Sequence, residues 1–308
     1  MSMVTFSAPG SLMLFGEHAV LRGHPALVCA IDRRIKVSLE ATTTGEVVVE
    51  SGLGRYRSRG SVLQDHPSFR FVLACLRRYV GVVEGGLDVR IDSEIDPTIG
   101  FGSSAAVTVA LLAGLKALGC EVPDGMAVAR VAQGVIREVQ GRGSGADAAA
   151  SGLGGVVWMR PDPLEAVCVA CPEWGLTTVY CGYKMPTAEV VGRVDAAAGR
   201  DPEVFKGLFE VSERLVGEAV AALRVGDVRR LGALMNAANG LHEAYGVNTR
   251  ELSELVFELR EDEGITGAKI SGSGLGDCVV GLGRSSRFLG GAAARVVGVD
   301  KEGVKREA

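Results

Sequence analysis

A glycine- and serine-rich stretch at residues 100–104 carries the clearest chemical signal in this chain of 308 residues. Its sequence is Gly-Phe-Gly-Ser-Ser, and the alanine-rich segment after it predicts a helix over residues 104–118. Glycines allow a backbone to approach an anion closely, and the free N–H groups at the start of a helix attract phosphate. The hydroxyl of Ser104 can also reach a Mg²⁺ ion bound to that phosphate. A simpler alternative, in which Ser103 only caps the helix and the glycines only form a turn, is equally open at this point.

The surroundings of this stretch argue against two other nucleotide-binding loops. Residues 100–105 match the Gly-x-Gly-x-x-Ala pattern of dinucleotide-binding proteins, which requires a strand before the first glycine and another strand after the helix. Residues 92–97 are instead polar and turn-forming, and residues 119–124 lead directly into another predicted helix. The Gly-x-x-x-x-Gly-Lys-Ser/Thr pattern of P-loop proteins does not occur anywhere in the sequence.

Together with two other stretches, the loop resembles the three motifs of the GHMP kinases, which include galactokinase and the homoserine, mevalonate and phosphomevalonate kinases. The first motif spans residues 8–21 (Ala-Pro-Gly-Ser-Leu-Met-Leu-Phe-Gly-Glu-His-Ala-Val-Leu), the second spans residues 97–106, and the third spans residues 269–278. The motifs occur in the order and at the spacing of that family. The resemblance covers nearly the whole chain.

Within this family the chain is most similar to the mevalonate kinases. The similarity rests on residues 16–20, on Lys-Met-Pro-Thr at residues 184–187 and on residues 234–247. It implies ATP-dependent phosphorylation of the 5-hydroxyl of (R)-mevalonate in isoprenoid biosynthesis, with ATP and Mg²⁺ as cofactors. Residues 140–149 and the pair at 277–278 are more similar to phosphomevalonate kinase, which is the alternative within the family.

The resemblance also implies roles for individual residues. Asp147 would be the catalytic carboxylate, because phosphoryl transfer uses such a group to orient or accept the proton of the attacking hydroxyl. Without the resemblance, Asp147 would be interpreted as the cap of a short helix at residues 148–150. Ser104 is the implied Mg²⁺ ligand. The implied ATP-binding residues are Pro97, Gly100, Gly102, Ser103, Ser104, Ala105, Gly272, Ser273 and Gly274. The implied substrate-site residues are Ser11, Glu17, His18, Lys184 and Thr187, with Glu17 as the structural member and His18 as a substrate contact.

One departure from the family pattern removes a positive charge. Most members have a lysine at the position of Ser11, beside the catalytic aspartate, where it stabilises the ionised carboxylate and the charge of the transition state. Lys184 or Arg142 could supply the missing charge.

A second departure removes a metal ligand. Mevalonate kinases carry a glutamate on the helix before the catalytic aspartate, where this chain has Ile136. Glu138 lies roughly 200° further round a regular helix and cannot simply take its place. Metal binding would then rest on Ser104, ATP oxygens and water. The two departures motivate an alternative of another class, a GHMP-fold sensor that binds ligand without turnover.

The elements that must position these groups form a mixed α+β protein. Apolar runs and apolar alternation predict strands at residues 26–31, 35–39, 47–50, 87–91, 156–159, 166–169 and 177–181. Helical spacing predicts helices at residues 69–80, 104–118, 126–139, 202–223, 228–245, 249–261 and 286–296. The third motif lies in a predicted hairpin-like unit at residues 268–282.

A cluster of turn-forming residues, Arg-Pro-Asp-Pro at 160–163, marks the predicted boundary between two domains. Residues 1–160 would form an N-terminal ATP-binding lobe and residues 161–308 a C-terminal lobe. The resemblance implies the two-lobed GHMP kinase fold, with a left-handed βαβ arrangement in the first lobe and a ferredoxin-like sandwich in the second.

Composition narrows the choice of partners. Apolar residues make up 47% and charged residues 23% of the chain, which indicates a folded globular protein. The net charge of −4 argues against a nucleic-acid partner. The first 14 residues lack the positive charge of a secretory signal, and the apolar stretch at residues 105–115 is too short to span a bilayer. The sequence therefore predicts a cytoplasmic protein with a small-molecule substrate and no membrane partner. A homodimer is compatible with this composition.

The seven cysteines are scattered, and one pair has the spacing of a redox motif. Cys168 and Cys171 lie in an apolar run that predicts a strand, in which residues three apart point to opposite faces. We therefore expect this pair to be a poor dithiol and the cysteines to be buried apolar residues.

Overall fold

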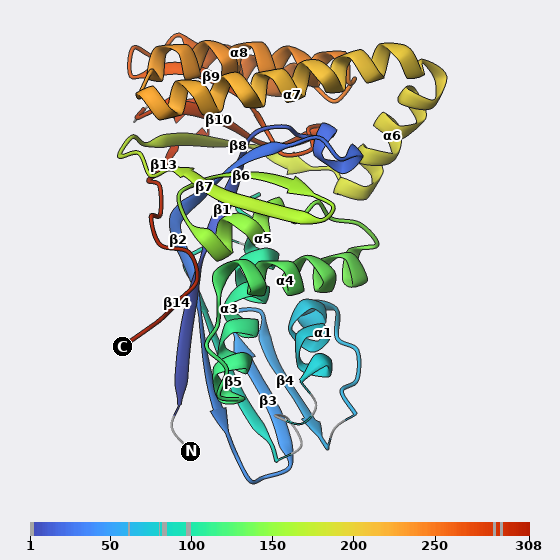
Figure 1. Ribbon diagram of the computed structural model, residues 1–308, viewed down its shortest axis with the longest axis vertical. Helices are drawn as coiled ribbons and strands as arrows, with labels where there is room; N and C mark the ends of the chain where they lie inside the picture. The colour runs from blue at the N-terminus through green and yellow to red at the C-terminus, as the bar shows by residue number, and fades with distance from the viewer. Residues whose placement is uncertain are drawn as a thin grey trace.

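Two β-sheets and the helices packed against them make up the fold (Figure 1). The computed structural model describes residues 3–60, 62–79, 81, 85–96, 100–285, 288–289 and 292–308. In Figure 1, α7 and α8 cover the smaller sheet at one end of the molecule, and the long strands of the larger sheet run to the other end.

The larger sheet has eight strands in the order β14-β1-β2-β5-β3-β4, with β6 and β7 added beside β2. Its strands are β1 (Val4–Phe15), β2 (Ala26–Ala41), β3 (Glu46–Ser51), β4 (Gly54–Arg59), β5 (Leu87–Ser93), β6 (Val156–Pro161), β7 (Leu164–Ala170) and β14 (Lys305–Arg306). All its described pairings are antiparallel except that of β3 with β5. In the C-terminal half of β2, Ile35, Val37 and Leu39 are buried and alternate with more exposed residues, so one face of the sheet is apolar.

Between strands β4 and β6, the chain forms the helices α1 (Arg70–Arg78), α3 (Ser103–Leu118), α4 (Gly125–Gln140) and α5 (Ala146–Leu153). Helix α3 packs against β1 and β2 and is buried almost all round, which its Ala, Val and Leu composition allows. A Cβ at Gly114 of α3 would overlap Leu39 of β2, so this glycine sets how closely the helix approaches the sheet. Helix α4 begins at the Asp124 cap, whose carboxylate accepts from the Ala127 N–H at 2.7 Å, and ends at Gly141.

The smaller sheet has the strand order β13-β8-β10-β9, and a separate two-stranded pair follows β10 in the chain. These strands are β8 (Leu176–Lys184), β9 (Ile265–Ser271), β10 (Gly276–Gly283), β11 (Phe288–Leu289), β12 (Ala292–Ala293) and β13 (Arg295–Val297). The helices of this part are α6 (Thr187–Arg200), α7 (Pro202–Val225), α8 (Val228–Ala244) and α9 (Arg250–Arg260). Helices α8 and α9 pack on β9, and α7 packs on α8. One hydrophobic core cluster contains side chains of both sheets, including Leu27 and Val280.

Most predicted elements are confirmed, but the last predicted helix is wrong over the described residues. The segment from 286 to 296 contains β11, β12 and the start of β13, and its residues 286, 287, 290 and 291 lie outside the described residues. The consecutive glycines at 290 and 291 oppose a helix, because glycine loses the most backbone freedom there.

The predicted boundary at residues 160–163 is the turn between β6 and β7, which both belong to the larger sheet. The division of the chain at residue 160 stays a prediction. In the described part of the chain, every helix falls short of the length and apolar character needed to cross a membrane.

The expectation that Cys168 and Cys171 point to opposite faces is wrong. Strand β7 ends at Ala170, and a register irregularity opposite Val156 and Val157 disturbs its regular alternation. The two sulfur atoms lie 3.5 Å apart.

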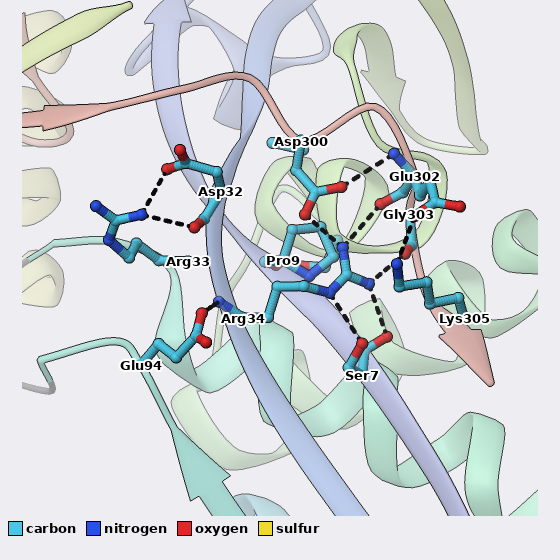
Figure 2. Close-up of polar contacts among 12 residues, drawn as sticks. Ser7, Pro9, Asp32, Arg33, Arg34, Glu94, Asp300, Glu302, Gly303 and Lys305 are labelled. Carbon is cyan, nitrogen blue, oxygen red and sulfur yellow. Dashed lines mark hydrogen bonds and ion pairs between the residues drawn. The ribbon is translucent and has the colours of Figure 1, made fainter. Parts of the chain in front are cut away.

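The segment of residues 298–308, here called the C-terminal strap, crosses the larger sheet and is held by Arg34 (Figure 2). The Arg34 guanidinium forms an ion pair with Asp300 and donates to the backbone carbonyls of Glu302 and Gly303 at 3.1 and 2.8 Å. It also donates to the Ser7 side-chain and backbone oxygens at 2.9 and 3.1 Å. Since the Arg34 and Asp300 side chains are only 16% and 11% exposed, removal of the guanidinium leaves buried acceptors without a donor.

We predict that Arg34→Ala lowers the free energy of unfolding by about 2–4 kcal/mol, because a mostly buried carboxylate and several carbonyls lose their partner. Arg33→Ala is the matched control, since Arg33 is the neighbouring residue and its ion pair with Asp32 is exposed (Figure 2). Urea denaturation measures both variants. Equal losses in the two would show that the arginine contacts of the strap are not what stabilises the fold.

Candidate functional site

A cavity of about 650 Å³ lies where the three glycine-containing motifs of the sequence meet. Of the residues predicted for the site, its lining includes Glu17, His18, Gly100, Gly102, Ser103, Ser104, Ala105, Asp147, Lys184, Thr187, Gly272 and Ser273. Pro97 lies outside the described residues. Ser11 and Gly274 lie behind the cavity wall: Ser11 contacts Asp147, and a Cβ on Gly274 would overlap the Val247 carbonyl.

The loop before α3 presents a helix N-terminus to this cavity. Gly102, in the left-handed conformation at φ 66°, is the N-cap, and α3 has no side-chain cap among the described residues. The Gly102 carbonyl accepts from the Ala105 and Ala106 N–H groups, each at 3.0 Å. Ser103 is therefore the first helical residue and not the cap, and the start of α3 is open to an anion.

Two glycines of this loop are required by close neighbours. A Cβ at Gly102 would overlap the Ser11 hydroxyl, and a Cβ at Gly100 would overlap the Asp277 carboxylate. The Gly100 N–H donates to Asp277 Oδ1 at 3.0 Å, and the Ser11 N–H donates to the Phe101 carbonyl at 3.0 Å. The loop is thus fixed by β1 on one side and by the start of β10 on the other.

Asp147 lies in the first turn of α5, with its side chain half-buried at the edge of the cavity. Gly145 is the N-cap of this helix, so the alternative in which Asp147 serves as the cap does not hold. The Ser11 hydroxyl donates to Asp147 Oδ1 at 2.7 Å. Burial raises the pKa of Asp147, while the Ser11 hydrogen bond and the Lys184 charge lower it and the Asp277 charge raises it, and the net direction is upward.

Asp277 is a site residue that the sequence prediction missed. Its carboxylate lines the cavity and forms an ion pair with Lys184, with Nζ and Oδ2 2.5 Å apart. The backbone of Asp277 is left-handed, at φ 72°, which directs its side chain towards the loop before α3. The signals in the sequence were its place within the third motif and the similarity of the pair at 277–278 to phosphomevalonate kinase.

Of the two candidates for the missing positive charge, Lys184 is the one that acts on the Asp147 carboxylate. Arg142 also lines the cavity, but its guanidinium is 3.5 Å from Asp195 of α6. Asp195 forms a second ion pair with Arg22, so α6 is connected to the first motif beside the cavity.

Few protein groups at the site could hold a metal. Ile136 lines the cavity, whereas Glu138 pairs with Arg78 at 2.7 Å and does not line it. Within the described residues, no group of three or more His, Cys, Asp or Glu side chains could hold a metal ion. Ser104 and the two aspartates are among the oxygen donors that line the cavity, and this set fits Mg²⁺, which usually takes one or two carboxylates and fills its shell with phosphate and water.

A buried ion pair connects the first motif to the third. Glu17 pairs with Lys269, and both side chains are at most 6% exposed. Burial raises the pKa of Glu17, but the charges of Lys269 and His242 and the hydrogen bond of Lys269 outweigh it, so the pKa of Glu17 is lowered. Burial lowers the pKa of Lys269, and the Glu17 charge opposes this effect. Burial lowers the pKa of the adjacent His242 to about 4, and Lys269 adds to this effect. The ion pair of Glu17 agrees with a structural role, which stays a prediction.

His18 makes a second connection between these motifs. Its backbone is left-handed, at φ 62°, and its Nε2 lies 2.8 Å from the Ser273 carbonyl. Because a carbonyl only accepts, Nε2 carries the proton and donates. Burial lowers the pKa of His18, which favours the neutral ring. His18 also lines the cavity.

The sequence is similar to known kinases over its whole length. The model of the GHMP kinases N terminal domain matches residues 68–155, and the model of the GHMP kinases C terminal domain matches residues 219–289. The chain is 32% identical to the mevalonate kinase of Thermococcus sibiricus, over 99% of this chain and 98% of that protein. It is 35% identical to the mevalonate kinase of Archaeoglobus fulgidus, over 98% of this chain and 99% of that protein. Among solved structures, L. major mevalonate kinase in complex with R-mevalonate has a TM-score of 0.80 and 27% identity, covering 96% of both chains.

We predict that Lys269→Met lowers the free energy of unfolding by about 3–5 kcal/mol, because it leaves the Glu17 carboxylate buried without a counter-charge. The double variant Glu17→Gln with Lys269→Met should recover part of the loss. Lys301→Met is the control, since its ion pair with Glu173 is exposed and should have little effect. Denaturation curves measure all three, and a double variant less stable than the single one would contradict the ion-pair explanation.

Proposed function

The chain belongs to the GHMP kinases, and from this premise we propose that it transfers the terminal phosphoryl group of ATP to the 5-hydroxyl of (R)-mevalonate. One observation carries the reaction type: the open N-terminus of α3 and the half-buried Asp147 carboxylate border the same cavity. The choice of acceptor is supported by the full-length similarity to proteins named mevalonate kinase. The cytoplasmic location and the homodimer stay predictions.

The chain provides two surfaces for the phosphates of ATP. One is the start of α3, where N–H groups and the positive end of the helix dipole stabilise negative charge. The other is the turn between β9 and β10, where Gly272 has a positive φ angle and lines the cavity. A Mg²⁺ ion bound to the phosphates would neutralise part of their charge, held by the Ser104 hydroxyl and an aspartate carboxylate.

In the proposed mechanism Asp147 orients the hydroxyl of the acceptor and takes its proton as the new phosphate ester forms. The Ser11 hydroxyl holds the carboxylate in one orientation through its hydrogen bond to Oδ1. Lys184 places positive charge near Asp147. It would therefore stabilise the carboxylate and the charge of the transition state, as a lysine at the position of Ser11 does in most of the family. His18 and Thr187, both at the cavity wall, would contact the acceptor.

Phosphomevalonate is the second candidate acceptor. Arg142 and Lys184 both line the cavity, and two cations suit an acceptor that carries a phosphate as well as a carboxylate. The alternative of a sensor without turnover is disfavoured by the raised pKa of Asp147, because perturbed carboxylates in cavities are typical of acid–base catalysis.

An assay of ADP release tests the proposal with mevalonate, phosphomevalonate, galactose and homoserine as acceptors. We expect turnover with mevalonate. Turnover with phosphomevalonate alone would show that phosphomevalonate, and not mevalonate, is the acceptor. Binding of ATP without turnover on any acceptor would favour the sensor.

Asp147→Asn should lower kcat by about 10²–10⁴-fold with little change in ATP affinity. Asp32→Asn, an exposed carboxylate outside the cavity, should leave kcat unchanged.

The pH dependence of kcat/KM gives a second prediction. Asp147 must be ionised to accept a proton, and its pKa is raised, so activity should fall on acidification at a pH above the pKa of about 4 of an ordinary aspartate. Lys184→Met removes a charge that lowers this pKa and should move the acidic limb to higher pH. Asp277→Asn removes a charge that raises it and should move the limb to lower pH. Shifts in the same direction for both variants would mean that another group controls the limb.

A further inference from the structure

Cys168 and Cys171 form a close pair of thiols on the larger sheet, away from the proposed phosphate site. Their sulfur atoms are 3.5 Å apart, within contact distance for two thiols. Cys168 is half-buried near the end of strand β7, and Cys171 is exposed just beyond the end of the strand. An oxidant in solution can therefore reach at least one member of the pair.

A glycine provides the space that both sulfurs occupy. A Cβ at Gly155 would overlap Cys168 Sγ and would lie 2.8 Å from Cys171 Sγ. Gly155 adopts φ 70° and follows α5, the helix that carries Asp147. Its N–H donates to the Asp300 carbonyl of the C-terminal strap at 2.7 Å. The pair thus rests on the junction of α5, β6 and the strap.

We propose that Cys168 and Cys171 are a modification site, a dithiol that a small disulfide such as glutathione disulfide oxidises to an intramolecular disulfide. A disulfide bond is about 2.05 Å long, so the sulfurs must approach by about 1.5 Å. The exposed end of the strand at Cys171 leaves room for this movement.

The reaction balances as two successive exchanges. The Cys171 thiolate attacks one sulfur of glutathione disulfide, forms a mixed disulfide and releases one glutathione thiolate. The Cys168 thiolate then attacks the Cys171 sulfur and releases the second glutathione thiolate. The two protons lost by the cysteines are taken up by the two glutathione thiolates, so two protein thiols are oxidised and one small disulfide is reduced to two thiols.

The surroundings assign the order of these steps. Cys171 is exposed just beyond the end of the strand, where a small disulfide can reach its sulfur. Burial raises the pKa of Cys168 to about 11, and its hydrogen bond with Cys171 adds to this effect. Cys171 is therefore the thiol that attacks the oxidant first, and Cys168 is the thiol that resolves the mixed disulfide.

The other cysteines are less suited to this reaction. Cys29, Cys75 and Cys278 are buried, and burial raises the pKa of each thiol. Cys181 donates to the Tyr183 carbonyl at 3.2 Å. Cys120 is exposed and serves as a reference for an accessible thiol elsewhere on the chain.

The test treats the full chain with glutathione disulfide and counts free thiols. We expect the loss of two of the seven thiols and their return after reduction with dithiothreitol. Cleavage after Glu165 and Glu173 releases a peptide of residues 166–173 that contains this pair and no other cysteine, and its mass should fall by about 2 Da. Cys168→Ser should retain a mixed disulfide on Cys171 instead. Cys120→Ser should behave as the unchanged chain does, with two thiols lost.

Three outcomes would overturn the proposal. One is a stable glutathione adduct on Cys171 in the unchanged chain, with Cys168 still free. Another is a disulfide that joins Cys168 to Cys29 in place of Cys171, which the peptide map would show as a link to the strand β2. The third is oxidation of Cys120 at the same rate as the pair, since it would show that exposure alone decides reactivity.

Discussion

A half-buried carboxylate, that of Asp147, is the constraint around which the proposed site is built. Burial disfavours the charge of Asp147, so the charged form needs partners that are fixed before a substrate arrives. The Ser11 hydroxyl supplies the hydrogen bond and Lys184 supplies the opposite charge, from strands of two different sheets. Where most of the family uses one lysine for the charge, this chain divides the task between a hydroxyl and a more distant cation. The division is possible only because Gly102 leaves room for the Ser11 side chain.

Elements with strong local signals could be predicted from the sequence. Helix α3 follows from its alanine content, and α4 follows from its periodicity and from the glycine at its end. The site residues of the three motifs were found because each glycine turn is local in the sequence. Their meeting in one cavity rests on the family resemblance, since no local rule relates residue 18 to residue 273.

Features that depend on distant partners could not be predicted. Asp277 reaches the loop before α3 through a left-handed backbone and through the pairing of β8 with β10, and neither leaves a pattern in the residues around it. The irregular end of β7 brings Cys168 and Cys171 together against the ordinary alternation of a strand. Residues 286–296 show a different error, because here an element was predicted wrongly. The apolar and alanine-containing segment suggested a helix, although part of it pairs with β8.

The C-terminal strap has a consequence for the order in which the fold can be completed during synthesis. Strand β1 contributes the first motif, yet one of its edges pairs with β14, about three hundred residues later in the chain. Until residues 305 and 306 have left the ribosome, the backbone groups of Phe6 and Ser7 on that edge have no strand beside them. The nascent chain therefore carries an open sheet edge through most of its translation, a period in which association with other unfinished chains competes with folding.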